Sequence, residues 1–155
     1  MGARTDFPNI NDVFGCLHIN WKDEYDWQNK KPSYQAIIRY FKVKSSDEAT
    51  VTAINDLKRL IVFGENFDDE EWYNYFMSDS SLGYYPPGDG LTEYEWLKDV
   101  LKILEEPMEE TEKHFIPRSS FDVKWEKLSE EDKKMYEVLE EARRVKLGYY
   151  DNDED

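Results

Sequence analysis

The chain has 155 residues, a formal net charge of −15 and a mean hydropathy of −0.87. Such a charge repels nucleic-acid phosphates and anionic lipid and attracts basic proteins, so neither nucleic acid nor a membrane is expected as a direct partner. The 8 Phe, 11 Tyr and 5 Trp residues exclude a disordered acidic chain, which would be poor in aromatics. No apolar run approaches the roughly 20 residues of a membrane span, and we expect a cytoplasmic protein.

The first half of the chain contains signals for several helices. Asn9 is expected to be the N-cap of a short apolar segment over residues 10–17. After a polar and aromatic connection, Ser33 is expected to cap a second helix over residues 34–43. Local residue types therefore predict two helical segments before residue 44.

The third and fourth helices have clearer boundaries. Ser46 is expected to begin the third helix, and Gly64 to end it in the C′ position. Asp68 and Glu71 have the spacing of a capping box and predict a helix over residues 69–77.

The next signals are a loop and the most regular helix of the chain. Residues 79–90 hold two prolines and three glycines, which predict a loop. Thr92 and Glu95 form a second capping box, which opens a helix that ends near Pro107. Its apolar residues recur at helical spacing: Leu97, Val100, Leu101 and Leu104.

The last third of the chain is predicted to contain an extended segment and one helix. Phe121, Val123 and Trp125 alternate as in a strand, so residues 108–128 are interpreted as an extended segment packed on the bundle. Ser129 is expected to begin a helix that runs to about Leu147 and is followed by an acidic tail at residues 151–155.

These elements predict an all-α protein, a compact single-domain bundle of about five to six helices with a C-terminal helical extension. Residues 1–106 are expected to form the helical domain. Residues 107–155 would form the extended segment, the last helix and the acidic tail, packed on that domain or trailing it.

The acidic residues are concentrated in one stretch. Residues 1–64 have a charge balance of +1, whereas residues 65–106 have 2 basic and 12 acidic residues. Nine aromatic residues are interspersed with acidic ones between Arg59 and Lys98. Carboxylates that steer association and aromatic rings that anchor it suit a site for a basic protein. The alternative is a solvated acidic surface whose aromatics point into the core.

The predicted partner-binding residues come from this stretch. They are Glu65, Asp68, Asp69, Glu70, Glu71, Trp72, Tyr75, Asp79, Tyr84, Tyr85, Asp89 and Glu93.

No motif for catalysis or metal binding is present in the sequence. The two histidines, His18 and His114, are far apart, and Cys16 is the single cysteine, so neither a zinc site nor a cofactor site is expected. No nucleophile elbow or phosphate-binding glycine loop occurs. We therefore expect a binding protein and no enzyme.

Two blocks of residues resemble a known family. The first block is Phe7-Pro8-Asn9, Phe14-Gly15-Cys16 and Trp21. The second is Gly83-Tyr84-Tyr85, Asp89-Gly90-Leu91-Thr92 and Trp96-Leu97. Together they resemble the CdiI-type immunity proteins of contact-dependent growth inhibition, over about residues 7–105.

The resemblance implies a bacterial cytoplasmic protein that binds and neutralises the C-terminal toxin domain of a cognate effector, often a nuclease, and so protects the producing cell. A nuclease domain needs Lys and Arg to hold phosphates, which fits an acidic inhibitor. The alternative function is an acidic mimic of nucleic acid that regulates a basic DNA- or RNA-binding protein of its own cell.

Overall fold

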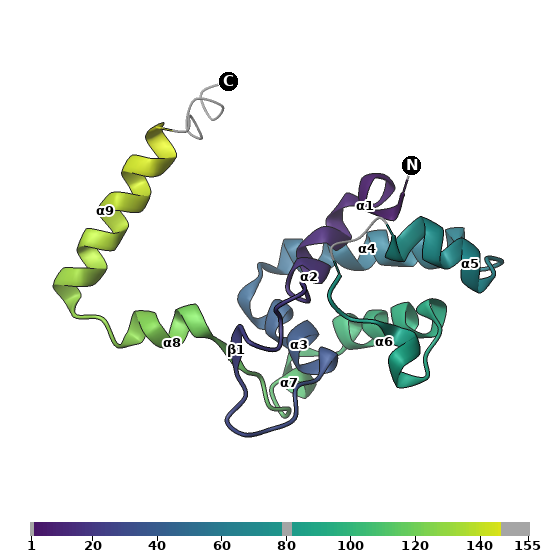
Figure 1. The fold of residues 1–155 in the computed structure, drawn as a ribbon, viewed down its shortest axis with the longest axis horizontal. Helices are drawn as coiled ribbons and strands as arrows, with labels where there is room; N and C mark the ends of the chain where they lie inside the picture. The colour runs from purple at the N-terminus through teal and green to yellow at the C-terminus, as the bar shows by residue number, and fades with distance from the viewer. Residues whose placement is uncertain (1, 79–81, 147–155) are drawn as a thin grey trace. The chain divides into compact units, whose positions relative to one another are not determined.

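The computed structural model describes residues 2–78 and 82–146 (Figure 1). The chain divides into two compact units, residues 1–118 and 119–155. Helices account for most of the described residues, and the predicted all-α class is confirmed. The predicted division near residue 106 stays a prediction, and the predicted tail at residues 151–155 lies outside the described residues.

The helices of the first unit surround one core, and among the described residues they are accompanied by one two-stranded sheet. In chain order they are α1 (Ala3–Asp6), η1 (Pro8–Ile10), α2 (Asn11–Gly15), β1 (Tyr25–Asp26), α3 (Tyr34–Lys44), α4 (Asp47–Phe63), α5 (Asp69–Trp72), η2 (Tyr73–Met77), η3 (Pro86–Asp89), α6 (Glu93–Glu105) and α7 (Met108–Thr111). Strand β2 (Arg118–Ser119) pairs with β1 at the unit boundary. The second unit contains α8 (Ser120–Glu126) and α9 (Glu130–Lys146).

Most of the predicted helix starts are confirmed by side-chain caps. Ser33 Oγ accepts a hydrogen bond from the Ala36 amide, and Ser46 Oγ accepts one from the Ala49 amide. The capping boxes that open α5 and α6 are both complete. The start of α9 is capped by Ser129. Short-range signals therefore fix where these helices begin.

The predicted cap at Asn9 is wrong. Pro8 occupies the first position of the η1 turn, where its fixed backbone angle is favourable, and Asn9 therefore lies inside this turn. The Asn9 amide donates to Asp56 Oδ2 at 2.9 Å, which joins the N-terminal segment to α4. Helix α2 begins after Ile10 with no side-chain cap.

Gly64 ends α4 as predicted, but for a different reason. Its φ is −99°, so it does not adopt the left-handed conformation of a C′ glycine. A Cβ at this position would lie 2.3 Å from the ring of Trp72. Gly64 therefore permits close packing between the end of α4 and α5.

The predicted extended segment at residues 108–128 is wrong. It contains α7 and α8, and Ser119 Oγ caps α8 by accepting from the Asp122 amide at 3.1 Å. Phe121 and Trp125 are four residues apart, so in a helix they share one face, and their rings stack with centroids 6.0 Å apart. The alternating pattern was also compatible with this helical pair.

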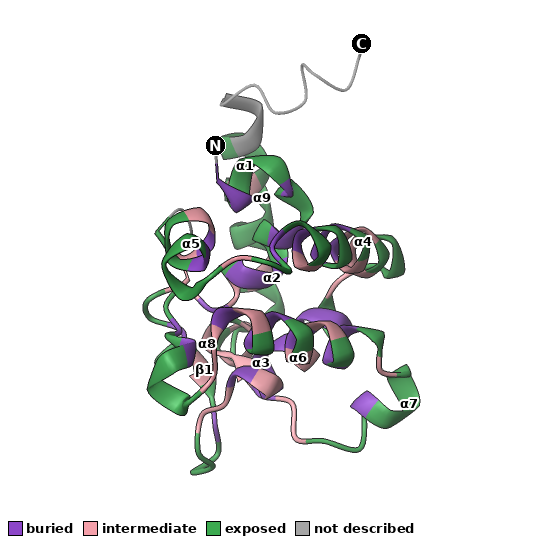
Figure 2. Cartoon of the chain, turned by 90° about the vertical axis from the view of Figure 1, so that its right-hand side faces the viewer, coloured by how far each residue is buried: buried purple, intermediate pink, exposed green. Residues whose placement is uncertain are grey.

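The core of the first unit forms where α3, α4 and α6 pack together. Helices α4 and α6 each bury one side and expose the other, whereas α3 is buried or half-buried up to its last two residues (Figure 2). Trp96 of α6 is fully buried, and four aromatic rings lie within 6.3 Å of it between centroids: Phe14, Tyr34, Phe76 and Tyr84. Aromatic packing therefore joins the N-terminal segment, α3 and η2 to α6.

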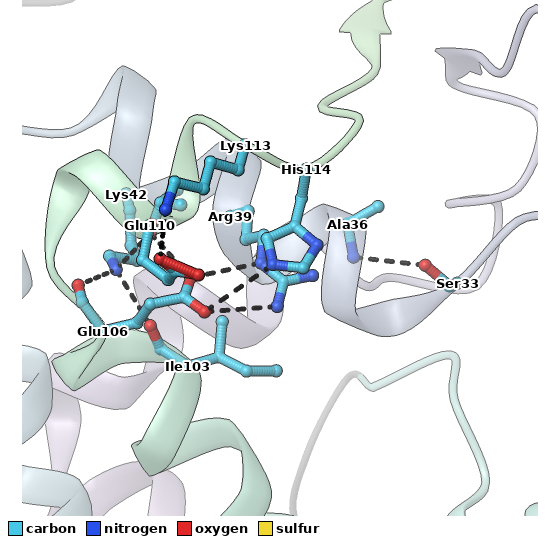
Figure 3. A network of polar contacts seen from close by, with 10 residues as sticks. Ser33, Ala36, Arg39, Lys42, Ile103, Glu106, Glu110, Lys113 and His114 are labelled. Carbon is cyan, nitrogen blue, oxygen red and sulfur yellow. Dashed lines mark hydrogen bonds and ion pairs between the residues drawn. The ribbon is translucent and has the colours of Figure 1, made fainter.

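A buried polar network holds the end of α6 against α3 and α7 (Figure 3). Lys42 Nζ donates to the carbonyls of Ile103 and Glu106, at 2.9 and 2.5 Å, and to Thr111 Oγ1 at 2.7 Å. The Glu106 carboxylate accepts from Arg39 Nε at 3.2 Å and from the Thr111 hydroxyl at 2.8 Å. The ammonium group supplies a donor to the Glu106 carbonyl, which the helix leaves unpaired, and a second donor to the Ile103 carbonyl, which also accepts from the Glu106 amide at 3.2 Å.

Candidate protein-binding site

Helix α5 begins in a run of four acidic residues, 68–71, which have two different roles. Asp68 and Glu71 form the capping box: the Glu71 amide donates to Asp68 Oδ1 at 2.8 Å, and the Asp68 amide donates to Glu71 Oε1 at 3.2 Å. Asp69 and Glu70 lie between them, are exposed and take no part in the cap. Two carboxylates thus stabilise the helix end, and two are available to a partner.

A buried ring holds this acidic turn in place. The side chain of Trp72 is 2% exposed, and its ring lies over Gly64. It also contacts Phe67 and Tyr94, with centroid distances of 5.2 and 6.0 Å. The acidic turn is therefore anchored to the core of the first unit, because Trp72, the last residue of α5, is part of that core.

A groove of about 540 Å³ is formed by α5, the start of η2, η3 and the start of α6. Two of its aromatic side chains are open to solvent: Tyr73 is 51% exposed and Tyr85 is 58% exposed. The residues that line it include Asp69, Glu70, Tyr73, Tyr85, Leu91 and Glu93. The groove combines acidic groups with accessible rings.

The structure separates the predicted site residues into several groups. Those that line the groove are Asp69, Glu70, Tyr85 and Glu93, the last of which is buried. Those exposed elsewhere on the same stretch are Glu65, Asp68, Glu71 and Asp89. Those in the core are Trp72 and Tyr84, whereas Tyr75 is half-buried and its hydroxyl donates to Asp6 Oδ2 at 2.5 Å. Asp79 lies outside the described residues.

Tyr73 is a groove residue that sequence reasoning did not select. It follows Asp69 by four positions and Glu70 by three, so helical spacing places all three side chains on one face. The same spacing places Trp72 and Phe76 together on the buried face. Periodicity across residues 69–76 could therefore have distinguished the exposed ring from the buried ones.

Residues of the two family-like blocks meet beside this groove. The indole Nε1 of Trp21 donates to the Gly83 carbonyl at 3.2 Å, and the Gly83 amide donates to the Leu17 carbonyl at 2.6 Å. A Cβ at Gly83 would lie 2.4 Å from the carbonyl oxygen of His18, so only glycine fits there. These contacts position Tyr84 and Tyr85 next to the N-terminal segment.

Within residues 2–78 and 82–146, no group of three or more His, Cys, Asp and Glu side chains is arranged to hold a metal ion. In the same part of the chain, no helix has the length and apolar character needed to span a membrane.

Comparison with protein families assigns this part of the chain to a known family. A family model described as CdiI immunity protein matches residues 17–104, more than half of the chain. The chain belongs to the CdiI immunity protein family. As a CdiI-type immunity protein it neutralises the toxin of a contact-dependent growth inhibition system. Searches of curated proteins and of solved structures gave no match.

The family match also places the groove within the CdiI-like part of the molecule. Residues 17–104 include α3, α4, α5, most of α6 and every residue that lines the groove. Helices α8 and α9 fall outside the match. The resemblance inferred from the two residue blocks is confirmed over this range.

Proposed function

We propose that this CdiI-type protein neutralises its toxin by binding a basic nuclease domain through an acidic surface at α5. We define the acidic surface as the exposed acidic residues Glu65, Asp68, Asp69, Glu70 and Glu71 together with the groove tyrosines Tyr73 and Tyr85. The observation that carries the proposal is the combination of exposed carboxylates on the α5 turn with the exposed rings of Tyr73 and Tyr85 in the groove beside it.

The carboxylates of the acidic surface form no ion pair with another described residue. Among the ion pairs of the described residues, none includes an acidic residue of this surface. Like charges this close repel each other, and a cationic partner would relieve that repulsion. The electrostatic field of the surface would also accelerate association with a basic domain.

A nuclease domain has the complementary chemistry. An enzyme that holds a phosphate backbone must present Lys and Arg side chains, and a nearby acidic inhibitor can pair with them. In such an interface, exposed rings such as Tyr73 and Tyr85 supply the apolar contact that charges alone do not. The buried Trp72 would act indirectly, because it holds the acidic turn in place.

The proposal can be tested with the purified toxin domain encoded next to this chain. We expect a stoichiometric complex, loss of nuclease activity in it, and growth of cells that express both proteins. Tyr73→Ala should weaken binding by roughly 1–2 kcal/mol, measured by titration calorimetry. Val51→Ala, at an exposed position on α4, should leave affinity unchanged and controls for a general effect of truncation.

Two results would contradict the proposal. A toxin domain with no nuclease activity would exclude the nuclease assignment, even where binding persists. Equal effects of Tyr73→Ala and Val51→Ala would place the interface elsewhere on the molecule. Capture of a basic nucleic-acid-binding protein of the same cell, with no effector gene nearby, would instead favour the nucleic-acid mimic.

A further inference from the structure

A second hollow, of about 1130 Å³, shares Tyr85 with the groove. We call it the tyrosine pocket and define it by six of the residues that line it: Trp21, Tyr34, Tyr84, Tyr85, Asp89 and Asp99. All of these residues fall within the family-matched segment. Its volume exceeds that of one side chain and is ample for a short loop.

Two tyrosine–aspartate pairs form part of the pocket wall. The Tyr34 hydroxyl donates to an Asp99 carboxylate oxygen, and the Tyr84 hydroxyl donates to Asp89 Oδ2 at 2.5 Å. An ionised carboxylate can only accept, so each hydroxyl proton is directed at its aspartate. The two rings lie side by side, with centroids 5.0 Å apart. Burial, together with these hydrogen bonds, raises the pKa of both tyrosine hydroxyls and keeps them protonated.

This arrangement leaves the wall with hydrogen-bond acceptors. The protons of the two tyrosine hydroxyls are already donated, and the indole N–H of Trp21 is donated to the Gly83 carbonyl. Lone pairs on the phenol oxygens and the second oxygen of each carboxylate remain to accept. A ligand that matches this wall must carry several donors, a positive charge and a flat apolar face.

We propose that the tyrosine pocket receives an arginine side chain of the toxin domain, carried on a loop that enters the hollow. This inference rests on the proposed function and names the group that the partner inserts. A guanidinium carries five N–H donors in one plane and stacks on aromatic rings, whereas an ammonium offers a point charge. Arg is also among the residues that most often dominate the energetics of protein interfaces.

Two lysines also line the pocket and define the competing ligand. Lys22 and Lys31 are exposed, and the Lys22 ammonium lies 5.5 Å from the centre of the Trp21 ring. An anionic ligand would depend on these two ammonium groups. An arginine would depend on Asp89 and Asp99 and would be repelled by the lysines. The two ligands therefore predict opposite effects of neutralising each pair.

The first test neutralises each pair in the full chain and measures affinity for the toxin domain. Asp89→Asn with Asp99→Asn keeps an oxygen that accepts from each tyrosine, removes both charges and replaces the second acceptor oxygen of each carboxylate with an amide donor. We expect it to weaken binding about 30-fold or more, as for loss of a desolvated ion pair. Lys22→Gln with Lys31→Gln should bind a few-fold more tightly. The reverse pattern, or no effect of the aspartate variant, would overturn the inference.

The second test occupies the pocket from within. A Cβ at Gly88 would lie 3.6 Å from the Tyr85 ring, an ordinary contact, so a side chain can be added there. Gly88→Arg places a guanidinium at the pocket wall to compete with that of the toxin, and Gly88→Gln adds a neutral side chain. We expect the arginine variant to bind at least about 10-fold more weakly than the glutamine variant. Equal affinities would contradict an arginine site.

Controls separate failure of this inference from failure of the proposed function. Thermal melting of every variant verifies that it folds. Suppose that the acidic-surface variant Asp69→Lys with Glu70→Lys loses affinity while the variants of the tyrosine pocket keep it. Then the inference that this pocket binds an arginine is wrong, and the proposed function stands. If the unchanged chain does not bind the toxin domain, the proposed function and this inference both fail.

Discussion

Helices α6 and α9 have the same kind of sequence and different surroundings. Both carry an apolar stripe at helical spacing and both begin with a side-chain cap. In α6 the stripe is buried and includes Trp96, Leu97, Val100 and Leu104. In α9 the stripe is largely exposed: the exposed fraction is 61% for Met135, 66% for Val138 and 63% for Leu139. The periodicity of a helix predicts which face is apolar, but not whether another element covers it.

The difference arises from contacts distant in sequence. Helix α6 packs between α3 and α4, and the network around Lys42 fixes its C-terminus. Within the second unit, α9 contacts α8 through Tyr136, whose ring lies 5.3 Å from that of Trp125. This contact uses a neighbouring side of α9 and leaves its apolar stripe uncovered by α8. The contrast between α6 and α9 can be tested by substitutions in both helices.

The largest expected difference concerns leucines at equivalent stripe positions. Leu97→Ala should lower the free energy of unfolding by about 2–5 kcal/mol, because it leaves a cavity in a closed core. Leu139→Ala should change it by about 0.5 kcal/mol or less, because that side chain is already in contact with water. Urea denaturation of both variants gives the comparison. Similar losses would show that α9 is packed as tightly as α6.

A smaller effect is expected at the C-terminus of α6. Lys42→Met should destabilise the chain by about 2–3 kcal/mol, because it leaves the carbonyl of Glu106 without a donor and removes one of the two donors to the Ile103 carbonyl. Lys58→Met is the matched control, since the Lys58 ammonium forms an exposed ion pair with Glu105 at 3.1 Å. It should cost about 1 kcal/mol or less in the same denaturation experiment. Equal costs would mean that the network does not hold α6.

The smallest effect is a pH dependence at Glu106. Partial burial acts to raise the pKa of this carboxyl, but hydrogen bonds from Arg39 and Thr111 outweigh it and hold the pKa below the ordinary value of 4.5. A lowered pKa in the folded state stabilises the fold above pH 4.5, and this stabilisation is lost as the pH falls through the folded-state pKa. The stability difference between the native chain and Glu106→Gln should therefore shrink below pH 4.5. A difference that does not vary with pH would contradict this role.

The parts of the fold that could be predicted have local causes. Ser33, Ser46 and both capping boxes act within three residues, and the sequence shows them directly. The errors arose where a distant or overlooked partner decides the outcome. The requirement for glycine at position 64 depends on the Trp72 ring, and the cap at Ser119 converts an alternating pattern into a helix.

The sequence predicts the negative charge of the candidate site, but it does not show which of its aromatic rings are exposed. A run such as Asp68 to Glu71 is solvated almost anywhere in a protein, so its exposure follows from composition. Neighbouring aromatic residues differ in burial: Trp72 packs in the core, whereas Tyr73 is exposed and lines the groove. The tyrosine pocket depends on Trp21 and Gly83, which are 62 residues apart, and no local pattern reveals such a contact.

The binding of the toxin domain by the acidic surface is tested most directly through association rates. Asp69→Lys with Glu70→Lys reverses the first two residues of α5 and spares the capping box. Glu130→Lys with Glu131→Lys reverses the first two residues of α9 and is matched in position and charge. Both variants are compared with the native chain by stopped-flow measurement at several salt concentrations.

Only the α5 variant is expected to associate more slowly with the toxin domain, by about 10-fold or more at low salt, and its rate should depend less on salt. The α9 variant should associate nearly as fast as the native chain. Equal slowing of the two variants would mean that net charge, and not the acidic surface, drives association. An unchanged rate for the α5 variant would contradict the proposed binding site.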